Sequence, residues 1–302
     1  MYELVIIGGG PCGLTAGIYA QRSRLKTLLI EKLGIGGQIA TSDLIENYPG
    51  FKGISGMGLM KEFEAQAAEL ALEIKYTEAL SIKDRGQYKE IMTPDGSIQA
   101  GAVIIATGAK PKRLGVPGEA ELIGRGISFC ATCDGFFFRD REVAVIGGGD
   151  SALKEAIYLS RIVKKVHLIH RRDKFRAEKM LIEKALAEPK FEFHLNKVVK
   201  SVKGGVLGIE ALELEDTRTH DTSDLPVEGA FIYIGVNPNT GSFDVEKDEF
   251  GFIKADKVLM TSMMGVFAAG DCRVTPLRQV ATAVGDGALA ASEVERYIES
   301  CR

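Results

Sequence analysis

Two cysteines, Cys130 and Cys133, stand three positions apart in the stretch FCATCDGFF, residues 129–137. In a C-x-x-C pair one thiol can have a lowered pKa while the other resolves a mixed disulfide, which suits thiol–disulfide exchange. The same spacing can supply two zinc ligands or form a permanent bridge. Zinc needs four ligands, and there is no second C-x-x-C; two of the four histidines, His194 and His220, are isolated in the sequence. We predict a redox-active pair and no metal site.

Asp134 follows the second cysteine directly and precedes Gly135. A buried carboxyl group at this place can protonate a departing thiolate or a reduced cofactor, provided that burial raises its pKa. The alternative is an ordinary turn-forming aspartate before a glycine. We carry Asp134 as a candidate catalytic acid beside Cys130 and Cys133.

The start of the chain, YELVIIGGGPCGLTAGIYAQRSRLKTLLIEK, is typical of a strand–helix–strand unit that binds a dinucleotide. Gly8 permits the tight turn, Gly10 lets a pyrophosphate approach the backbone, and Gly13 allows close packing of the helix on the sheet. The helix that begins at Pro11 directs its free N–H groups at the phosphates. Glu31 ends the second strand, where an acid binds ribose hydroxyls.

A second unit of this kind begins at EVAVIGGGDSALKEA, with Gly147 and Gly149 in the turn and Asp150 and Ser151 at the start of its helix. Its second strand ends in basic residues rather than in an acid. Guanidinium groups bind a 2′-phosphate in bidentate fashion, so the unit is predicted to prefer NADPH. The alternative is a solvated basic helix start. The basic residues are His170, Arg171, Arg172 and Arg176.

Two nicotinamide cofactors in one chain would serve no purpose, because neither passes electrons onward except as a hydride. A flavin in the first unit accepts hydride from NADPH and passes two electrons to a sulfur pair. The two units and the C-x-x-C therefore predict a pyridine nucleotide–flavin–disulfide relay.

Composition agrees with a globular enzyme of more than one domain. The chain has 302 residues, 45% of them hydrophobic and 26% charged, and a net charge of −3, which favours neither a nucleic acid nor a membrane surface as partner. The opening residues contain no basic leader, and no apolar run is long enough to span a bilayer. We expect a cytosolic protein, in which five cysteines do not form a structural disulfide framework.

These motifs together resemble the low-molecular-weight thioredoxin reductases, a family of flavoprotein disulfide reductases. The resemblance covers essentially the whole chain and rests on segments in the family's order: GGGPCGLTA, GGQIATSDLIENYPGF, ATGAKPKRLGVPGE, CATCDG, VIGGGDSALKEA, HRRDKFRAEK and VFAAGDC…RQVATAVGDGALAA. It implies an NADPH-dependent thioredoxin-disulfide reductase that uses FAD, forms a homodimer and has thioredoxin or a thioredoxin-like protein as its partner.

The resemblance also implies roles for single residues. Cys133 would exchange electrons with the flavin, Cys130 would attack the partner's disulfide, and Asp134 would act as the acid. Gly235 belongs to the implied NADPH segments. Residues implied to line the flavin are Gln38, Asn47, Thr107, Gly108, Asp271, Arg278, Gln279 and Val280.

Three other cysteines need an account. Cys12 lies in the first glycine turn, where the family usually has alanine, and Cys272 follows Asp271, where an apolar residue is common. Both are expected to be small buried residues, with a redox-active thiol near the flavin as the alternative. Cys301 near the C-terminus has no neighbouring thiol, and we assign it no role.

The alternation of strands and helices predicts an α/β fold with two doubly wound Rossmann-like nucleotide-binding domains. Flavin segments lie at both ends of the chain, so the NADPH domain is predicted to be inserted into the FAD domain. The expected boundaries are 1–110 and 239–302 for the FAD domain and 111–238 for the NADPH domain. Residues 61–76, KEFEAQAAELALEIKY, are predicted to form an amphipathic helix.

The inserted domain raises a question of mechanism, because nicotinamide, disulfide and partner must reach the flavin or the sulfurs in turn. We expect the domain to rotate between half-reactions. Phe136, Phe137 and Phe138 cannot all face one side of the chain, so we expect some of them to be exposed. They are interpreted either as core packing between the domains or as a docking surface for thioredoxin. Rival interpretations are a ferredoxin-dependent reductase of the same fold, a small-dithiol oxidase and a non-catalytic nucleotide-binding module.

Overall fold

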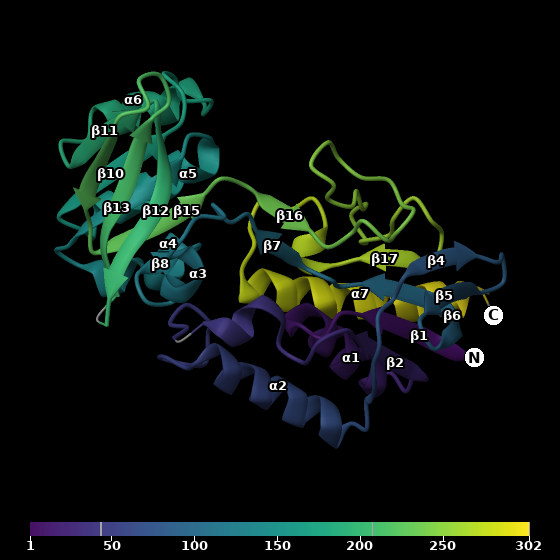
Figure 1. The fold of residues 1–302 in the computed structure, drawn as a ribbon. Helices are drawn as coiled ribbons and strands as arrows, with labels where there is room; N and C mark the ends of the chain where they lie inside the picture. Colours follow the sequence, from purple (N-terminus) through teal and green to yellow (C-terminus); the bar gives the residue numbers. More distant parts are fainter. Residues whose placement is uncertain (43, 207, 302) are drawn as a thin grey trace. The chain divides into compact units, whose positions relative to one another are not determined.

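A computed structural model describes residues 1–42, 44–206 and 208–301. The chain divides into two compact units: unit 1 is Met1–Lys110 with Asn237–Arg302, and unit 2 is Pro111–Val236 (Figure 1). The second boundary lies two residues before the one that we placed from the sequence. No described helix is long and apolar enough to cross a membrane.

Unit 1 is built on a seven-stranded sheet in the order β3-β2-β1-β6-β5-β4, with β17 paired to β6. Strands β3, β2, β1, β6 and β17 run parallel, whereas β5 and β4 are antiparallel additions. The strands are β1 Tyr2–Ile7, β2 Thr27–Glu31, β3 Glu73–Tyr76, β4 Ser81–Asp84, β5 Lys89–Thr93, β6 Gly96–Ile105 and β17 Val266–Ala268. The helices are α1 Pro11–Arg22, α2 Gly56–Glu69 and α7 Val280–Cys301, with 3₁₀ turns η1 Gly37–Thr41 and η3 Gly270–Cys272.

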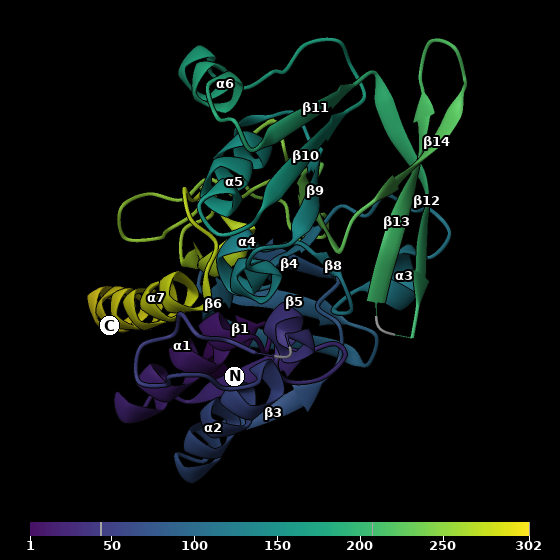
Figure 2. The same ribbon diagram turned by 90° about the vertical axis from the view of Figure 1, so that its left-hand side faces the viewer.

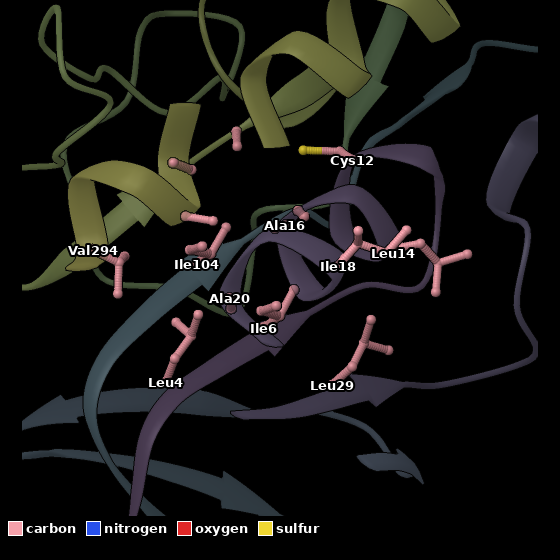
Figure 3. Close-up of a cluster of buried hydrophobic side chains, with 14 of the residues drawn as sticks. Leu4, Ile6, Cys12, Leu14, Ala16, Ile18, Ala20, Leu29, Ile104 and Val294 are labelled. Atoms are coloured by element: carbon pink, nitrogen blue, oxygen red, sulfur yellow. The ribbon is translucent and has the colours of Figure 1, made fainter. Parts of the chain in front are cut away.

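Alternation along β1 explains the layers of unit 1. Leu4 and Ile6 point to one face and pack with α1 and α7, whose small residues bring the two helices close together (Figures 1 and 3). Val5 and Ile7 point to the other face and pack against the irregular segment that follows Asn239. Both faces of β1 are buried, which is the reason for its unbroken apolar run.

The predicted helix over residues 61–76 is wrong at its end. Helix α2 stops at Glu69, Ala71 adopts a left-handed φ of 55°, and Glu73–Tyr76 form strand β3 beside β2. The helix begins earlier than predicted, because the Ser55 side chain accepts a hydrogen bond from the Gly58 N–H and caps it. The apolar spacing in ALEIKY is typical of a helix, but these residues instead form hydrogen bonds with the edge of β2 as strand β3.

Unit 2 contains a five-stranded parallel sheet in the order β11-β10-β9-β15-β8 and an antiparallel sheet of three strands, β12-β13-β14. Its strands are β8 Ile127–Ser128, β9 Glu142–Gly147, β10 Lys165–His170, β11 Phe191–Leu195, β12 Lys197–Gly205, β13 Gly208–Asp216, β14 Thr222–Pro226 and β15 Gly229–Tyr233. Its helices are α3 Glu119–Leu122, α4 Ala131–Asp134, α5 Asp150–Ser160 and α6 Lys179–Leu186, with the 3₁₀ turn η2 Gly135–Phe138.

The two faces of the parallel sheet in unit 2 have different covers. Val166 and Leu168 of β10 pack with α5 and α6, whereas Ile169 packs with residues of β12 and β13 (Figure 2). The order β11-β10-β9-β15 matches β3-β2-β1-β6 in unit 1, with a strand–helix–strand unit at the same place. Each unit is therefore a doubly wound nucleotide-binding fold, as predicted.

The chain passes between the units twice, and the two passages pair with each other. Strands β7 Ala109–Pro111 and β16 Val236–Pro238 form a two-stranded sheet. The Asn239 N–H donates to the Gly108 carbonyl at 3.0 Å, and the Lys112 N–H donates to the Gly235 carbonyl at 2.9 Å. Both crossings thus lie side by side.

Candidate functional site

The turn after β1 can be made only with glycines at two places. Gly8 has a φ of 115°, and a Cβ there would lie 2.4 Å from the Ala106 carbonyl oxygen. A Cβ at Gly13 would lie 1.8 Å from the Gly8 carbonyl oxygen, so α1 rests directly on the turn. At Gly10 a Cβ would meet nothing within 4 Å, and no side chain caps the helix that begins at Pro11. This open, uncapped helix start fits a pyrophosphate.

Glu31 reaches back from the end of β2 to the same turn. Its Oε2 accepts a hydrogen bond from the Gly9 N–H at 2.7 Å, and its Oε1 accepts one from the Leu33 N–H at 2.8 Å. These two bonds fix the carboxylate beside the glycine turn, where the ribose next to a bound pyrophosphate would lie. The sequence predicted an acid at the end of β2, but it did not predict these two hydrogen bonds to the backbone.

The carboxyl-terminal part of unit 1 places a buried acid after β17. Burial raises the pKa of Asp271 to about 6, Arg278 opposes the rise and Asp286 adds to it. The Arg278 guanidinium lies 4.0 Å from the centre of the Phe252 ring, a cation–π contact, and its Nε–H donates to the Asp271 carbonyl at 3.4 Å. Asp271 is thus held in an environment of low polarity, where a hydrogen-bonding hydroxyl of a ligand would stabilise it.

The remaining predicted flavin residues all belong to unit 1. The Asn47 amide Nδ2 donates to Gln279 Oε1 at 3.2 Å, which joins the loop before α2 to the start of α7. Thr107 is bonded to Asn239 through Oγ1 to the carbonyl at 2.7 Å and through the return bond from Asn239 Nδ2 at 2.9 Å. Gly108 has a φ of 66°, Gln38 is exposed in η1, and Val280 is buried as the first residue of α7.

An ion pair that the sequence analysis missed supports this region. The Asp286 carboxylate of α7 accepts hydrogen bonds from Arg273 Nε at 2.6 Å and Nη2 at 2.8 Å, and Oδ2 also accepts the Gly270 N–H at 2.8 Å. The pair holds the turn that carries Asp271, whose first residue, Gly270, has a φ of 74°. A bidentate contact of this kind has no signature in the sequence, because Asp286 lies 13 residues beyond Arg273.

In unit 2, Cys130 and Cys133 form a disulfide. Cys130 is the N-cap of the short helix α4, and its Sγ accepts a hydrogen bond from the Cys133 N–H at 3.2 Å. Asp134, the last residue of α4, accepts the Ser128 hydroxyl through Oδ2 at 2.6 Å. The carboxyl group of the candidate acid therefore lies within the same turn of chain as the disulfide.

A tyrosine that we did not predict supports the C-x-x-C turn. The Ala131 N–H, which lies between the two cysteines, donates to the Tyr233 hydroxyl oxygen at 2.5 Å. Burial raises the pKa of Tyr233, and the neighbouring Glu155 raises it further. Burial also raises the pKa of Glu155, whose Oε2 has no hydrogen-bond partner within the described residues. The partly buried Tyr233 hydroxyl thus holds the turn between the two cysteines.

The second glycine turn has the same construction as the first. A Cβ at Gly147 would lie 2.5 Å from the Tyr233 carbonyl oxygen and 2.7 Å from the Ala152 Cβ, whereas one at Gly149 would meet nothing within 4 Å. Asp150, the first residue of α5, accepts the Glu178 N–H at 2.9 Å, and Ser151 is exposed beside it. Gly235, with a φ of 123°, follows β15. The open helix start again fits a pyrophosphate.

The basic residues after β10 divide into two kinds. The His170 ring is buried against the second glycine turn, so that a Cβ at Gly148 would lie 2.2 Å from it, and its Nε2–H donates to the Lys174 carbonyl at 3.1 Å. Burial lowers the pKa of His170, and the neighbouring arginines lower it further. Arg171, Arg172 and Arg176 are exposed, and their guanidinium groups make no hydrogen bond or ion pair with any described residue. His170 therefore shapes the turn, and the three arginines are the free cations.

His194, which is isolated in the sequence, has a second histidine beside it in the fold. Its Nε2 lies 3.1 Å from His167 Nδ1, because β11 pairs with β10 and places both rings on one face of the sheet. The two residues are 27 positions apart, and parallel register cannot be read from sequence spacing.

Cys12 and Cys272 are free, buried thiols in unit 1, and the Cys12 sulfur is visible at the start of α1 in Figure 3. Burial raises the pKa of Cys12 well above its ordinary value and that of Cys272 to about 11. Thiols held in this way stay protonated and unreactive at neutral pH, which favours the account of small buried residues. Cys301 is free and exposed.

Comparisons with known proteins agree with this geometry. The family model for pyridine nucleotide-disulphide oxidoreductases matches residues 2–287. The chain is 42% identical to the thioredoxin reductase of Bacillus subtilis (strain 168), over 99% of this chain and 95% of that protein. It is 44% identical to the thioredoxin reductase of Helicobacter pylori (strain J99), over 99% of both.

The chain belongs to the thioredoxin reductase family. A crystal structure of thioredoxin reductase from Streptococcus pyogenes MGAS5005 is 45% identical, covers 99% of each chain and has a TM-score of 0.94. Members of this family are flavin-dependent disulfide reductases that use a pyridine nucleotide. The thioredoxin reductase fold supplies both nucleotide turns described above, and their open helix starts fit these two cofactors.

Proposed function

We propose that this protein catalyses the NADPH-dependent reduction of the disulfide of thioredoxin or a thioredoxin-like protein, with FAD in unit 1 and NADPH in unit 2. In the net reaction NADPH and a proton reduce one disulfide to two thiols and leave NADP⁺. The observation that carries the proposal is the Cys130–Cys133 disulfide in the same unit as the second glycine turn with its free arginines. Relatives 42–44% identical are named thioredoxin reductases.

FAD is favoured over a mononucleotide flavin by the first glycine turn. A pyrophosphate and an adenosine ribose are present only in the dinucleotide, and the open space at Gly10 and the Glu31 carboxylate beside the turn support their binding there. When bound, the flavin supplies a two-electron relay between nicotinamide and disulfide. Asp271, in its buried position, would accept a hydrogen bond from a ligand hydroxyl.

NADPH is favoured over NADH by the three exposed guanidinium groups that follow β10. No described acid pairs with Arg171, Arg172 or Arg176, so each is free to bind a 2′-phosphate. An exchange of all three for alanine should raise the KM for NADPH by about two orders of magnitude, or about 2.7 kcal/mol, since each exposed guanidinium–phosphate pair contributes up to about 1 kcal/mol. The KM for NADH should change little.

The sulfur chemistry falls to the C-x-x-C. The disulfide takes up two electrons and becomes two thiols, of which one, as thiolate, attacks the partner's disulfide and the other resolves the mixed disulfide. We assign the attack on the partner to Cys130 and the exchange with the flavin to Cys133. We assign to Asp134, at the end of α4, the donation of a proton to the departing thiolate.

We also propose that unit 2 rotates relative to unit 1 during turnover. The two crossings that join the units are adjacent, paired strands, which permits motion about a single short ribbon. If NADPH binds to unit 2 and FAD to unit 1, as proposed, the nicotinamide and the disulfide of unit 2 must each reach the flavin in turn. An engineered cross-link between the units should stop reduction of thioredoxin; undiminished steady-state turnover of the locked enzyme would disprove the rotation.

Two exposed aromatic side chains follow the disulfide closely in the chain. Phe136 and Phe137 are 58% and 47% exposed, whereas Phe138 is buried and packs edge-to-face on Phe231. We propose that the first two contact thioredoxin. Alanine at both places should raise the KM for thioredoxin at least several-fold and leave the reduction of a small aromatic disulfide unchanged.

The first test of the function is an anaerobic titration with NADPH and then NADH, followed by flavin absorbance, for wild type, Cys133→Ser and Cys130→Ser. NADPH should reduce the flavin, and wild type should take up about two more electrons than either variant. The variant that forms a stable mixed disulfide with thioredoxin identifies the attacking sulfur. If NADPH leaves the flavin oxidised while dithionite reduces it, the alternative of a ferredoxin-dependent reductase or a small-dithiol oxidase replaces the proposal.

A homodimer in the cytosol completes the proposal and rests on the resemblance to the family. Sedimentation velocity of the flavin-loaded protein should give twice the mass of 32.6 kDa. A single species at the monomer mass over the working concentration range would contradict the dimer.

A further inference from the structure

Two histidines and a glutamate meet on one face of the parallel sheet in unit 2. His167 lies on β10, and Glu192 and His194 lie on β11; His167 is the register partner of Glu192, and His194 is two residues further along the same face. His167 Nδ1 is 3.1 Å from His194 Nε2 and 3.9 Å from Glu192 Oε2, and His194 Nε2 is 3.4 Å from Glu192 Oε1. One ligand atom of each side chain lies within 4.8 Å of the others.

We propose that His167 Nδ1, His194 Nε2 and a Glu192 carboxylate oxygen form a binding site for a borderline divalent metal of the zinc class. Ligand atoms on a tetrahedral zinc ion with bonds of about 2.0–2.1 Å are roughly 3.3 Å apart, close to the separations found here. Two imidazole nitrogens with one carboxylate oxygen suit zinc, copper and nickel better than magnesium or calcium. Water would complete the coordination.

A second carboxylate orients the first ligand. Glu142 Oε2 lies 3.4 Å from His167 Nε2 and accepts a hydrogen bond from its N–H, which leaves the Nδ1 lone pair as an acceptor. Without a metal, the His194 Nε2–H donates to this lone pair; a metal would replace that proton, which His194 can then carry on Nδ1. A histidine held by a carboxylate on its far nitrogen is the usual arrangement around protein-bound metals. Glu142 lies on β9, so three adjacent strands contribute to the cluster.

Charge and access both permit a cation. The side chain of His167 is 5% exposed and that of His194 is 17% exposed, whereas Glu192 is 45% exposed and provides a route from solvent. Lys164 pairs with Glu142, and Lys165 pairs with Glu192, so the cluster is balanced before a metal binds. Lys165 is the competing cation, and its side chain, 38% exposed, can turn into solvent when the metal arrives.

The site lies apart from the nucleotide turn. Val166 and Leu168, the neighbours of His167 on β10, face α5, whose start adjoins the glycine turn. Because side chains alternate along a strand, His167 faces the other side of the sheet. A metal there would join β11, the edge strand, to β10. Its expected effect is to hold the edge of the sheet rather than to take part in electron transfer.

The test is zinc binding by calorimetry on the flavin-loaded, oxidised protein carrying Cys301→Ser, so that no exposed thiol competes. One equivalent of Zn²⁺ should bind to this protein and to a His220→Ala control, and His194→Gln should abolish saturable binding. Glu142→Gln should weaken binding by about 10–100-fold, the range for partners of metal-bound histidines. Lys165→Gln should strengthen it, because the competing ammonium is gone.

Two further readouts separate metal binding from a folding defect. Copper(II) bound to the same protein should show imidazole nitrogen hyperfine coupling in its electron paramagnetic resonance spectrum, and this coupling should be lost in His194→Gln. Zinc should slow amide hydrogen exchange in Phe191–Leu195 of wild type and should not slow it in His194→Gln. Absence of saturable zinc binding by wild type, or equal binding by His194→Gln with unchanged flavin content, would overturn the proposal.

Discussion

Glycines 10 and 13 are three positions apart on one turn, yet the structure assigns them different tasks, and alanine at each should separate cofactor binding from folding. A Cβ at Gly13 would lie 1.8 Å from the Gly8 carbonyl oxygen, which is backbone and cannot rotate away. A Cβ at Gly10 would meet nothing within 4 Å of the chain. The first methyl group collides with protein, and the second occupies space where a phosphate would lie.

The magnitudes follow from these contacts. To relieve the Gly13 clash, α1 must move by roughly 1 Å from its turn against a packed core, at a cost of about 1–3 kcal/mol or more. Gly10 has a φ of −80° and a ψ of −174°, which alanine adopts without strain. The loss at the N-cap and the gain from a stiffer unfolded chain nearly offset each other, so stability should change by less than about 1 kcal/mol. Flavin affinity should fall at least tenfold, or about 1.4 kcal/mol.

The assay measures the two properties separately. Urea unfolding of the flavin-free proteins reports stability, and quenching of flavin fluorescence on addition of protein reports the dissociation constant. Gly241→Ala is the matched control, because its Cβ also meets nothing within 4 Å and it lies outside the turn. Wild-type flavin affinity in Gly10→Ala would refute the phosphate site. Equal stability of Gly13→Ala and Gly10→Ala would refute the packing argument.

Three more predictions concern groups that the structure places in defined surroundings. The pKa of Asp271 is raised from 3.8 to about 6, so between these pH values the native flavin-free protein holds a proton that the unfolded chain releases. The free energy of unfolding should therefore fall by at most about 3 kcal/mol as pH rises from about 4 to about 6, and urea unfolding of Asp271→Asn should lack this fall. Asp286→Asn should destabilise unit 1 by about 2–4 kcal/mol in thermal unfolding, because it leaves the largely buried Arg273 guanidinium and the Gly270 N–H poorly paired. The control Arg296→Ala, which breaks an exposed ion pair, should cost less than about 1 kcal/mol. Tyr233→Phe removes the acceptor of the buried Ala131 N–H and should destabilise unit 2 by about 1–3 kcal/mol by the same measurement; an unchanged midpoint would show that the N–H has another acceptor.

The features that could be predicted from the sequence are those written in local patterns. The spacing of Gly8, Gly10 and Gly13 is a local pattern, and the contact between Gly13 and Gly8 is local too. The C-x-x-C likewise brings its own sulfurs together within one turn of helix. The alternation of strand and helix around both turns predicted the doubly wound fold. Strand ends were also predictable where an apolar run stops at a charged residue, as β2 does at Glu31.

Contacts between residues far apart in the chain were not predictable. Tyr233 accepts a hydrogen bond from Ala131 across 102 positions, and His167 meets His194 only because β10 and β11 pair in one particular register. His170 was predicted only as one of the basic residues of the NADPH site, and the packing of its ring against Gly148 was not foreseen, because burial of a ring depends on what covers the strand and not on the strand's own pattern. The end of α2 was misplaced for the same reason, since the four residues of β3 pair with the edge of β2, which cannot be read from their own pattern.

The split of unit 1 into two stretches of sequence also determines the order in which the protein can fold during synthesis. Helix α1 packs on α7, and β6 pairs with β17, so the first 110 residues leave the ribosome without the partners that cover their apolar surface. Unit 2 is continuous from Pro111 to Val236 and has its own core, so it can fold while unit 1 still lacks its carboxyl-terminal stretch. The part of the chain that is made first is therefore the part that is finished last, and it remains open to aggregation or chaperone binding until the final 66 residues emerge.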